Sequence, residues 1–200
     1  MESLATIYDR AFFTNYGAHN AEYARACYLI AKELAARFQP RTAVDWGCGS
    51  GLHASGLQQH GVKVIGVDGV RVDDDLVARN VTIKQADLTA PIPADLTWPG
   101  YDLSLCIDVM EHLDDNVSEV ALSNILRGAG LAILSCAPPG QGGHHHVNER
   151  PRRYWVARLA ALGWKYQRRE TGLMERYFLG QRDQLTQSWM YHNLCVYRPE

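Results

Sequence analysis

The chain has 200 residues, of which 46% are hydrophobic and 21% are charged, and its formal net charge is −2. This length predicts one domain that buries a core without support from disulfides or metals. The nearly balanced charge argues against a nucleic-acid or anionic-membrane partner, and the apolar runs fall short of the roughly 20 residues that a membrane span needs.

Predicted helices and strands alternate along the chain. Residues 20–38 place Tyr23, Cys27, Ile30 and Leu34 on one stripe of a helix, which Pro40 ends. The other predicted helices, each followed or closed by a glycine, are 50–61, 114–128 and 151–163. Apolar segments predict strands at 42–47, 62–69, 81–88, 101–110 and 131–137, and then at 164–170, 176–180 and 193–198.

Strands that alternate with helices are typical of an α/β sandwich around a largely parallel sheet. The last strands follow one another without a helix, which predicts an antiparallel edge. We therefore expect a Rossmann-like three-layer sandwich with a mostly parallel sheet of about seven strands and an antiparallel C-terminal edge. In such sheets ligands bind outside the carboxyl ends of the strands, so we expect the functional residues in the loops that follow them.

A glycine-rich loop, Gly47-Cys48-Gly49-Ser50-Gly51, joins the first predicted strand to a helix. Glycines permit a tight turn and let a ligand approach the backbone, and the start of the helix offers free N–H groups. Asp68 ends the second strand about 20 residues later, where an acidic side chain can bind ribose hydroxyls. A dinucleotide-binding loop has a small residue where this chain has Leu52, whereas the spacing here is G-x-G-x-G, with Asp45 two residues before the first glycine.

This spacing resembles that of the class I S-adenosylmethionine-dependent methyltransferases. The segments VIGVDG, IKQADL and YDLSLCIDVMEHL resemble the motifs of that family at the second, third and fourth strands, in the same order. The resemblance runs from Thr42 to the C-terminus, and it implies S-adenosylmethionine as cofactor and S-adenosylhomocysteine as product. We expect one compact cofactor-binding domain at residues 41–200, preceded by a lid or helical segment at residues 1–40.

The cofactor contacts that the resemblance implies lie at the ends of the first four strands. They are Asp45, Gly47, Cys48, Gly49, Gly51, Ile107 and Asp108 for the methionine part, Asp68 and Gly69 for the ribose, and Asp87 with the Leu88 backbone for the adenine. Each acid taken alone is also compatible with a solvated strand end. Their joint occurrence at successive strand ends favours the cofactor.

The stretch PPGQGGHHHVNERP, residues 138–151, follows the fifth strand and carries three adjacent histidines. Zinc takes about four ligands, and adjacent side chains point in different directions, so we predict no metal site from this run. A neutral imidazole can instead remove the proton of a hydroxyl acceptor near pH 7. Such a base can come from this run or from His112, which follows the fourth strand.

The same stretch resembles a loop of small bacterial methyltransferases with a GQGG…HVNE motif and a terminal W-x-x-x-N strand. The resemblance makes His146 the first candidate for the base, with Asn148 orienting the substrate or the loop. The catalytic candidates are thus His146, His112 and Asn148, and the substrate candidates are Glu149, Arg150, Trp189 and Asn193. Alternatively, Asn148 caps the next helix and both histidines only pack.

Two further features leave alternatives open. Arginines at positions 150, 152 and 153 either bind an anionic substrate group or form a solvated surface. The aromatic residues of the N-terminal segment, Tyr8, Phe12, Phe13 and Tyr16, form either a lid or part of the core. The five cysteines form no C-x-x-C pair, and the first residues lack the layout of a signal peptide, so we expect reduced thiols in the cytoplasm.

We expect methyl transfer to a small-molecule acceptor, first of all to a hydroxyl of a sugar or natural product. An amine that is methylated by proximity alone is the second possibility. The N/D-P-P-Y/F motif of enzymes that methylate amino groups of bases or glutamine is replaced by DVME, and no recognition domain for nucleic acid is appended. Alternatives from other classes are a nicotinamide-dependent oxidoreductase and a catalytically silent binding protein. The sequence does not indicate an oligomeric state.

Overall fold

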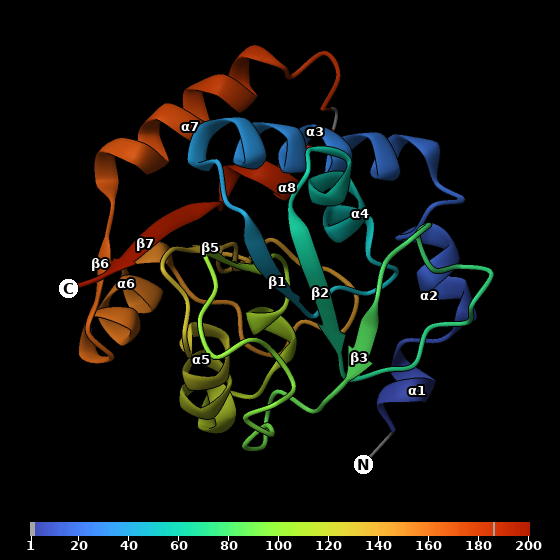
Figure 1. Cartoon of the computed structure of the whole chain (residues 1–200), viewed down its shortest axis with the longest axis horizontal. Helices are drawn as coiled ribbons and strands as arrows, with labels where there is room; N and C mark the ends of the chain where they lie inside the picture. Colours follow the sequence, from blue (N-terminus) through green and yellow to red (C-terminus); the bar gives the residue numbers. More distant parts are fainter. Residues whose placement is uncertain (1–2, 186) are drawn as a thin grey trace.

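The computed structural model describes residues 3–185 and 187–200, and a seven-stranded sheet forms its centre (Figure 1). The strands are β1 Thr42–Trp46, β2 Lys63–Asp68, β3 Ile83–Gln85, β4 Leu103–Cys106, β5 Ala132–Leu134, β6 Trp164–Tyr166 and β7 Cys195–Pro199. Their spatial order is β3-β2-β1-β4-β5-β7-β6. The first five strands are parallel, and β7 pairs antiparallel with both β5 and β6. The predicted fold class and its antiparallel C-terminal edge are confirmed.

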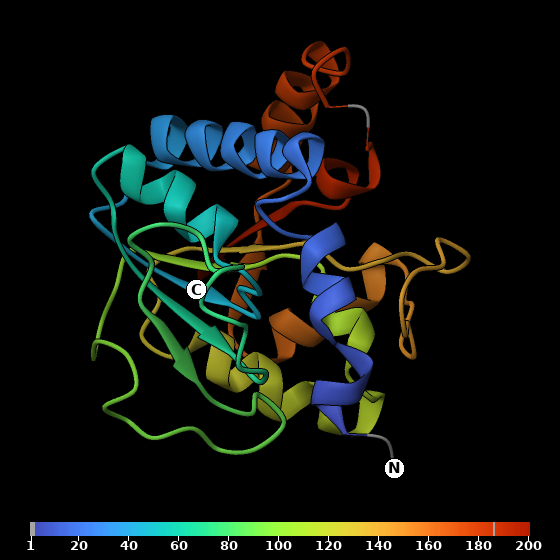
Figure 2. The same cartoon turned by 90° about the vertical axis from the view of Figure 1, so that its right-hand side faces the viewer.

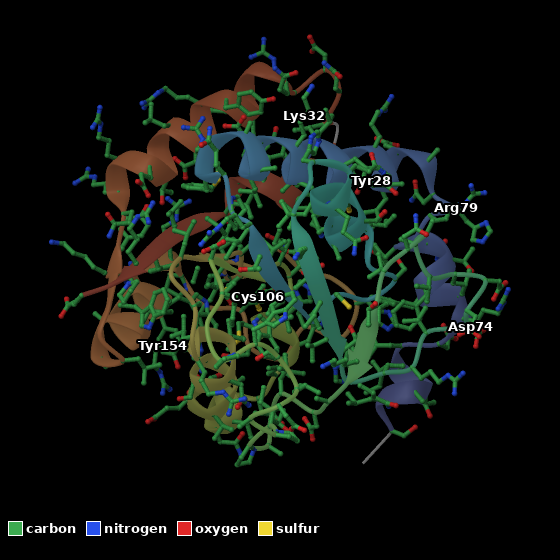
Figure 3. All side chains as sticks on the ribbon, in the orientation of Figure 1. Tyr28, Lys32, Asp74, Arg79, Cys106 and Tyr154 are labelled. Atoms are coloured by element: carbon green, nitrogen blue, oxygen red, sulfur yellow. The ribbon has the colours of Figure 1, made fainter. Side chains whose placement is uncertain are left out.

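Helices cover both faces of the sheet, which makes three layers (Figure 1). The helices are α1 Leu4–Ile7, α2 Arg10–Asn15, α3 Ala21–Phe38, α4 Leu52–Gln59, α5 Ser118–Leu126, α6 Arg152–Ala161, α7 Arg168–Gly180 and α8 Trp189–His192, with short 3-10 turns at Met110–His112 and Asp115–Val117. One core lies between the sheet and α3, α4, α7 and α8, and a second lies between the sheet and α5 and α6. Figure 3 marks Tyr154 on α6, on the face opposite α3.

The alternation of side chains along β1 determines which face of the sheet carries the Asp45 carboxylate. Ala43 packs in the core beneath α3 and α4, whereas Val44 and Trp46 pack in the other core. Because successive side chains of a strand point to opposite faces, Asp45 faces the α3 and α4 side. It lies near the carboxyl end of its strand, next to the glycine-rich loop.

Two predicted strands are wrong. Residues 176–180 belong to α7, which buries Thr171, Met174 and Phe178 at the three- and four-residue spacing of a helix. The short aromatic run in this segment favoured a strand, but the longer helical period decides. Likewise, the W-x-x-x-N segment is no strand, because residues 189–192 form α8 and Asn193 follows as its C-terminal cap.

The two short N-terminal helices lie over the carboxyl ends of the strands. Figure 2 shows α1 and α2 next to the loop that follows β5. Arg10 on α2 forms ion pairs with Asp73, at 2.6 Å, and with Asp75 in the loop after β2. Within residues 3–185 and 187–200, no helix has the length and apolar content to cross a membrane.

Candidate functional site

A cavity of about 500 Å³ opens at the carboxyl ends of β1 and β4, where the sequence places the ligand. The predicted residues that line it are Asp45, Gly47, Cys48, Gly49, Ile107, Asp108, His112, His146 and Trp189. The predicted residues that do not line it are Gly51, Asp68, Gly69, Asp87, Leu88, Asn148, Glu149, Arg150 and Asn193. Lining residues that sequence reasoning missed include Glu111, Gln141, Tyr23 and His53.

The three glycines of the loop after β1 have different roles. All three have positive φ, at 65° for Gly47, 52° for Gly49 and 78° for Gly51. A Cβ on Gly47 would lie 2.4 Å from Val109, and one on Gly51 would lie 2.9 Å from Val81, so both glycines are needed for packing. A Cβ on Gly49 would meet only Phe13, at 3.7 Å. Gly49 therefore presents its backbone to open space in the cavity wall.

Asp68 holds this loop in place. Its carboxylate accepts a hydrogen bond from the Gly49 N–H at 2.7 Å and another from the Val70 N–H at 2.8 Å. Burial raises the pKa of the Asp68 carboxyl, and the backbone N–H donors act in the opposite direction. The end of β2 is thereby joined to the glycine-rich loop at the end of β1.

Asp45 is a buried carboxylate on the cavity wall. It is 2% exposed, and its Oδ2 atom has no hydrogen-bond partner among the described residues. Burial raises the pKa of Asp45 to about 7, with a smaller contribution from the charge of Asp68, while the backbone N–H of Ala54 lowers it. A buried carboxylate oxygen without a partner favours a positively charged ligand group beside it.

A second acid, Asp108, joins the ends of β4 and β5. Its backbone has a φ of 54°, in the left-handed region, and its carboxylate accepts a hydrogen bond from Ser135 Oγ at 2.6 Å. The Asp108 N–H in turn donates to Ser135 Oγ at 2.9 Å. Burial raises the pKa of Asp108 to about 7, against the effect of the Ser135 hydroxyl. The strained backbone is thus held by paired bonds to the next strand.

Three side chains converge where the loops after β4 and β5 meet. Glu111, His112 and His146 each offer one ligand atom, and these atoms lie within 4.8 Å of one another. Glu111 is fully buried, with Oε1 accepting the Ala137 N–H at 3.2 Å and Oε2 without a partner among the described residues. His112 Nδ1 is likewise buried and unpartnered within that range. Burial and then the nearby His146 lower the pKa of His112 to about 4.

Glu149 orients His146. Glu149 Oε1 lies 2.9 Å from His146 Nδ1 and 2.6 Å from the Gly142 nitrogen, while Oε2 accepts the Gly140 N–H at 2.7 Å. The His146 hydrogen bond is the main cause that lowers the pKa of Glu149, so this carboxylate is ionised at neutral pH. Glu149 therefore closes the GQGG loop and leaves Nε2 as the ring nitrogen of His146 free for a ligand.

The three adjacent histidines point to different neighbours. The Nε2 atom of His144 lies 2.6 Å from the carbonyl oxygen of Ile7, and its ring packs 5.0 Å from that of Phe12. His145 is exposed and has a φ of 56°. Only His146 turns inward to Glu111 and His112. The loop thus supplies one histidine to the cluster and one to the contact with the N-terminal helices.

Asn148 and Arg150 lie outside the cavity, so neither side chain is placed to contact a substrate there. Asn148 is 3% exposed and donates to the carbonyl oxygen of Leu113 at 3.0 Å and to Ser118 Oγ at 3.2 Å. Arg150 donates to Asn148 Oδ1 at 2.9 Å, and its guanidinium lies 5.3 Å from the ring centre of Tyr154. Asn148 fastens the loop to the segment after β4, and Arg150 belongs to the surface beside α6.

Aromatic side chains form the wall opposite the strand ends. Trp189 stacks on Tyr23 at 6.4 Å between ring centres, and Phe12 packs against Tyr16 at 4.9 Å. All four line the cavity. Asn193 lies behind this wall, where it donates to Gln141 Oε1 at 2.9 Å and joins the end of α8 to the GQGG loop.

The residues expected at the adenine end lie farther from the cavity. Asp87 is exposed, and its carboxylate accepts hydrogen bonds from the Thr89 N–H at 2.8 Å and the Thr89 hydroxyl at 2.7 Å. The Leu88 side chain is part of the core beneath α5. A Cβ on Gly69 would lie 3.5 Å from Leu4, so α1 covers this end of the strands.

Comparison with known proteins gives one consistent family. A family model described as "Methyltransferase domain" matches residues 18–194. The chain is 26% identical over 134 residues to a ubiquinone biosynthesis O-methyltransferase of Alkalilimnicola ehrlichii, covering 60% of this chain and 47% of that protein. It thus spans about half the length of the curated relatives it matches.

Solved structures share the fold at low identity. A TehB-like SAM-dependent methyltransferase from Corynebacterium glutamicum superposes with a TM-score of 0.65 at 18% identity. The match covers 96% of this chain and 100% of that one. The 1,6-didemethyltoxoflavin-N1-methyltransferase of Burkholderia thailandensis, solved with S-adenosylhomocysteine, gives a TM-score of 0.62 at 14% identity, covering 98% of this chain and 88% of that one.

Proposed function

Because the chain belongs to the methyltransferase-domain family, we propose that it transfers a methyl group from S-adenosylmethionine to a hydroxyl group of a small molecule. The observation that carries this proposal is one cavity that combines two kinds of wall. One contains the open backbone of Gly49 and the unpartnered Oδ2 atom of Asp45. The other contains the cluster of Glu111, His112 and His146. Family membership sets aside the nicotinamide-dependent alternative.

The residues of the first wall fit S-adenosylmethionine. This cofactor supplies an electrophilic methyl group on a positively charged sulfur when it is bound. Asp45, buried and without a partner at Oδ2, suits the cationic methionine part, and Gly49 leaves space for it. Asp68 keeps lone pairs for ribose hydroxyls, since each of its oxygens accepts one backbone N–H. Of the remaining candidates, Gly47, Cys48, Ile107 and Asp108 already line the cavity.

The adenine end requires a shift of the N-terminal helices. Gly69, Asp87 and Leu88 remain our proposed contacts there, as does Gly51 in the loop backbone. Leu4 lies over Gly69, and Phe13 lies over Gly49. Because α1 is a single turn, whereas α2 is also held by the buried Phe13, we expect α1 to make most of this movement.

The cluster at the second wall favours a hydroxyl acceptor over an amine. A hydroxyl must lose its proton as its oxygen bonds to the methyl carbon, whereas a neutral amine needs only to be positioned. We propose His146 as the residue that contacts this hydroxyl, His112 as its neighbour in the cluster, and Asn148 as a positioning residue that holds the loop. Methylation of an oxygen is also what the curated relatives are named for.

The charges around the cavity limit the acceptor. Among the described residues that line it, none is lysine or arginine, while three are aspartate or glutamate. Arg150, the sequence candidate for binding an anionic group, packs on Tyr154 instead. We therefore propose an acceptor without negative charge, held against the aromatic rings of Trp189 and Tyr16.

Calorimetry and labelled S-adenosylmethionine test this proposal. Asp68→Ala is expected to weaken cofactor binding by about tenfold to a hundredfold, because charge-assisted hydrogen bonds are lost. Asp183→Ala removes an exposed carboxylate outside the cavity and should leave the affinity unchanged. A panel of hydroxylated and amino acceptors should then show label only in an oxygen product. Wild-type protein that does not bind S-adenosylmethionine would refute the proposal.

A further inference from the structure

We propose that Glu111, His112 and His146 together bind one divalent transition-metal ion, Zn²⁺ by preference, in the wall of the cavity. The sequence argues against a metal in the histidine run, because adjacent histidines cannot share one ion. The fold changes the ligand set. It takes one histidine from that run and adds a glutamate and a histidine from the loop after β4.

The three residues lie close together, and two of them have buried atoms without a partner. One atom from each of the three residues lies within 4.8 Å of the others. Glu111 Oε2 and His112 Nδ1 are buried, and neither has a hydrogen bond within the part of the chain that the structure describes. A buried polar atom without a partner costs free energy, and a cation between these atoms would satisfy both.

The groups around the cluster form hydrogen bonds like those that orient the ligands of known metal sites. Metal-binding histidines commonly donate their other ring N–H to a carboxylate, which fixes the ring and raises its basicity. Glu149 does this for His146, at 2.9 Å, and is itself held by the Gly140 and Gly142 N–H groups. Glu149 and the glycine run thus act together to hold His146.

Glu111 is supported in the same way from its other side. Its Oε1 accepts the Ala137 N–H at 3.2 Å, and its backbone oxygen accepts the N–H groups of Val147 and Asn148 at 2.9 and 3.0 Å. These bonds tie the loop after β4 to the loop after β5. Both sources of ligands are therefore fixed relative to each other without an ion, as a preorganised site requires.

A cation would also stabilise the ionised form of Glu111. Glu111 is fully buried, and a buried carboxylate is stabilised by a positive partner. No lysine or arginine belongs to the described lining of the cavity, so no side chain supplies that charge. Two imidazoles and one carboxylate are a ligand set that Zn²⁺ accepts, and it leaves a coordination position open.

The proposed role of the ion rests on the proposed function, whereas its binding does not. An ion in this place would lower the pKa of an acceptor hydroxyl that reaches the open position. The hydroxyl proton would pass to water, and His146 would act as a ligand instead of as a free base. The inference thus specifies how the cluster activates the acceptor.

Metal binding can be measured on the full chain without a histidine tag. After treatment with a strong chelator, we expect the protein to bind one Zn²⁺ in calorimetry, and one Co²⁺ with visible absorption bands of a nitrogen- and oxygen-bound ion. His146→Ala should lower the affinity at least a hundredfold, and Glu149→Gln, which keeps the shape of the side chain, by about ten- to a hundredfold. His144→Ala, a histidine of the same loop outside the cluster, should bind the ion as the wild type does.

The outcomes separate the two proposals. Absence of a one-to-one Zn²⁺ complex, or unchanged Zn²⁺ affinity in both His146→Ala and Glu149→Gln, would overturn the metal site. Full methyl transfer by the chelated protein would overturn the proposed role of the ion, though not its binding, and would make His146 a metal-free base. Tight Zn²⁺ binding that depends on these residues supports the site even if no methyl transfer is found, because that failure concerns only the proposed function.

Discussion

The titration of Asp45 is expected to control the affinity for S-adenosylmethionine around neutral pH. Burial raises the pKa of this carboxyl to about 7, and its Oδ2 atom has no partner among the described residues. The methionine part of the cofactor carries positive charge, so it should bind the ionised form of Asp45 better than the neutral form. The affinity should therefore rise with pH.

The size of the effect follows from the pKa. With a pKa of about 7, roughly a tenth of the Asp45 carboxyl groups are ionised at pH 6 and roughly nine tenths at pH 8. If only the ionised form binds well, the apparent affinity rises about tenfold over this interval, because it scales with the competent fraction. Binding should also release a proton at pH 6, as the cation draws Asp45 into its charged form.

Calorimetry at several pH values measures the Kd for S-adenosylmethionine in the wild type and in Asp45→Asn. Asp68 and Asp108 lie near Asp45, their pKa values are also raised by burial, and the α-amino group of the cofactor titrates near pH 8. These contributions are common to both proteins, so the ratio of the two Kd values isolates Asp45. That ratio should change about tenfold between pH 6 and pH 8. A ratio that is constant with pH would refute the reasoning.

Two other predictions concern the loop and the core. Gly49→Val and Gly61→Val each place a side chain at a positive φ, 52° and 83°, and each should lose about 1–2 kcal/mol of unfolding free energy. Only Gly49→Val should weaken cofactor binding, by at least tenfold, and equal weakening by both would contradict our assignment of the open space near Phe13. Burial lowers the pKa of His53 to about 4, below the ordinary 6.5, so the unfolded chain binds more protons between these values and stability falls as the pH drops from 6.5 towards 4. Urea unfolding at pH 7 and pH 4.5 should show about 2–3 kcal/mol of this loss in the wild type and not in His53→Gln; an equal loss in both would exclude His53 as its source.

Local patterns were sufficient to predict the order of most elements. Alternating apolar segments and glycine stops each depend on neighbours within about ten residues, and the sheet confirms the fold class that they predict. Residues 176–180 are the instructive failure. Their short aromatic run fits a strand, but Met174 and Phe178 continue the buried stripe of α7, and burial against the rest of the protein decides between the two periods.

Local sequence patterns predicted only some of the residues of the candidate site. The sequence places Asp45, Gly49 and His146 at or beyond the carboxyl ends of their strands, and parallel strands bring these ends to one edge. Glu111 was missed, although it stands next to His112 in the sequence. The only signal was its position after a strand, which many surface acids share.

Only the tertiary structure decided which side chains meet. Glu111 and His146 are separated by more than thirty positions in the chain, and their approach depends on the hydrogen bonds that hold the two loops together. In the same loop, Asn148 bonds to the Leu113 carbonyl oxygen and Glu149 bonds to His146. A local pattern determines which elements form because their periods are short. The pairing of side chains across loops depends on the packing of the whole sheet, which no short segment of the sequence contains.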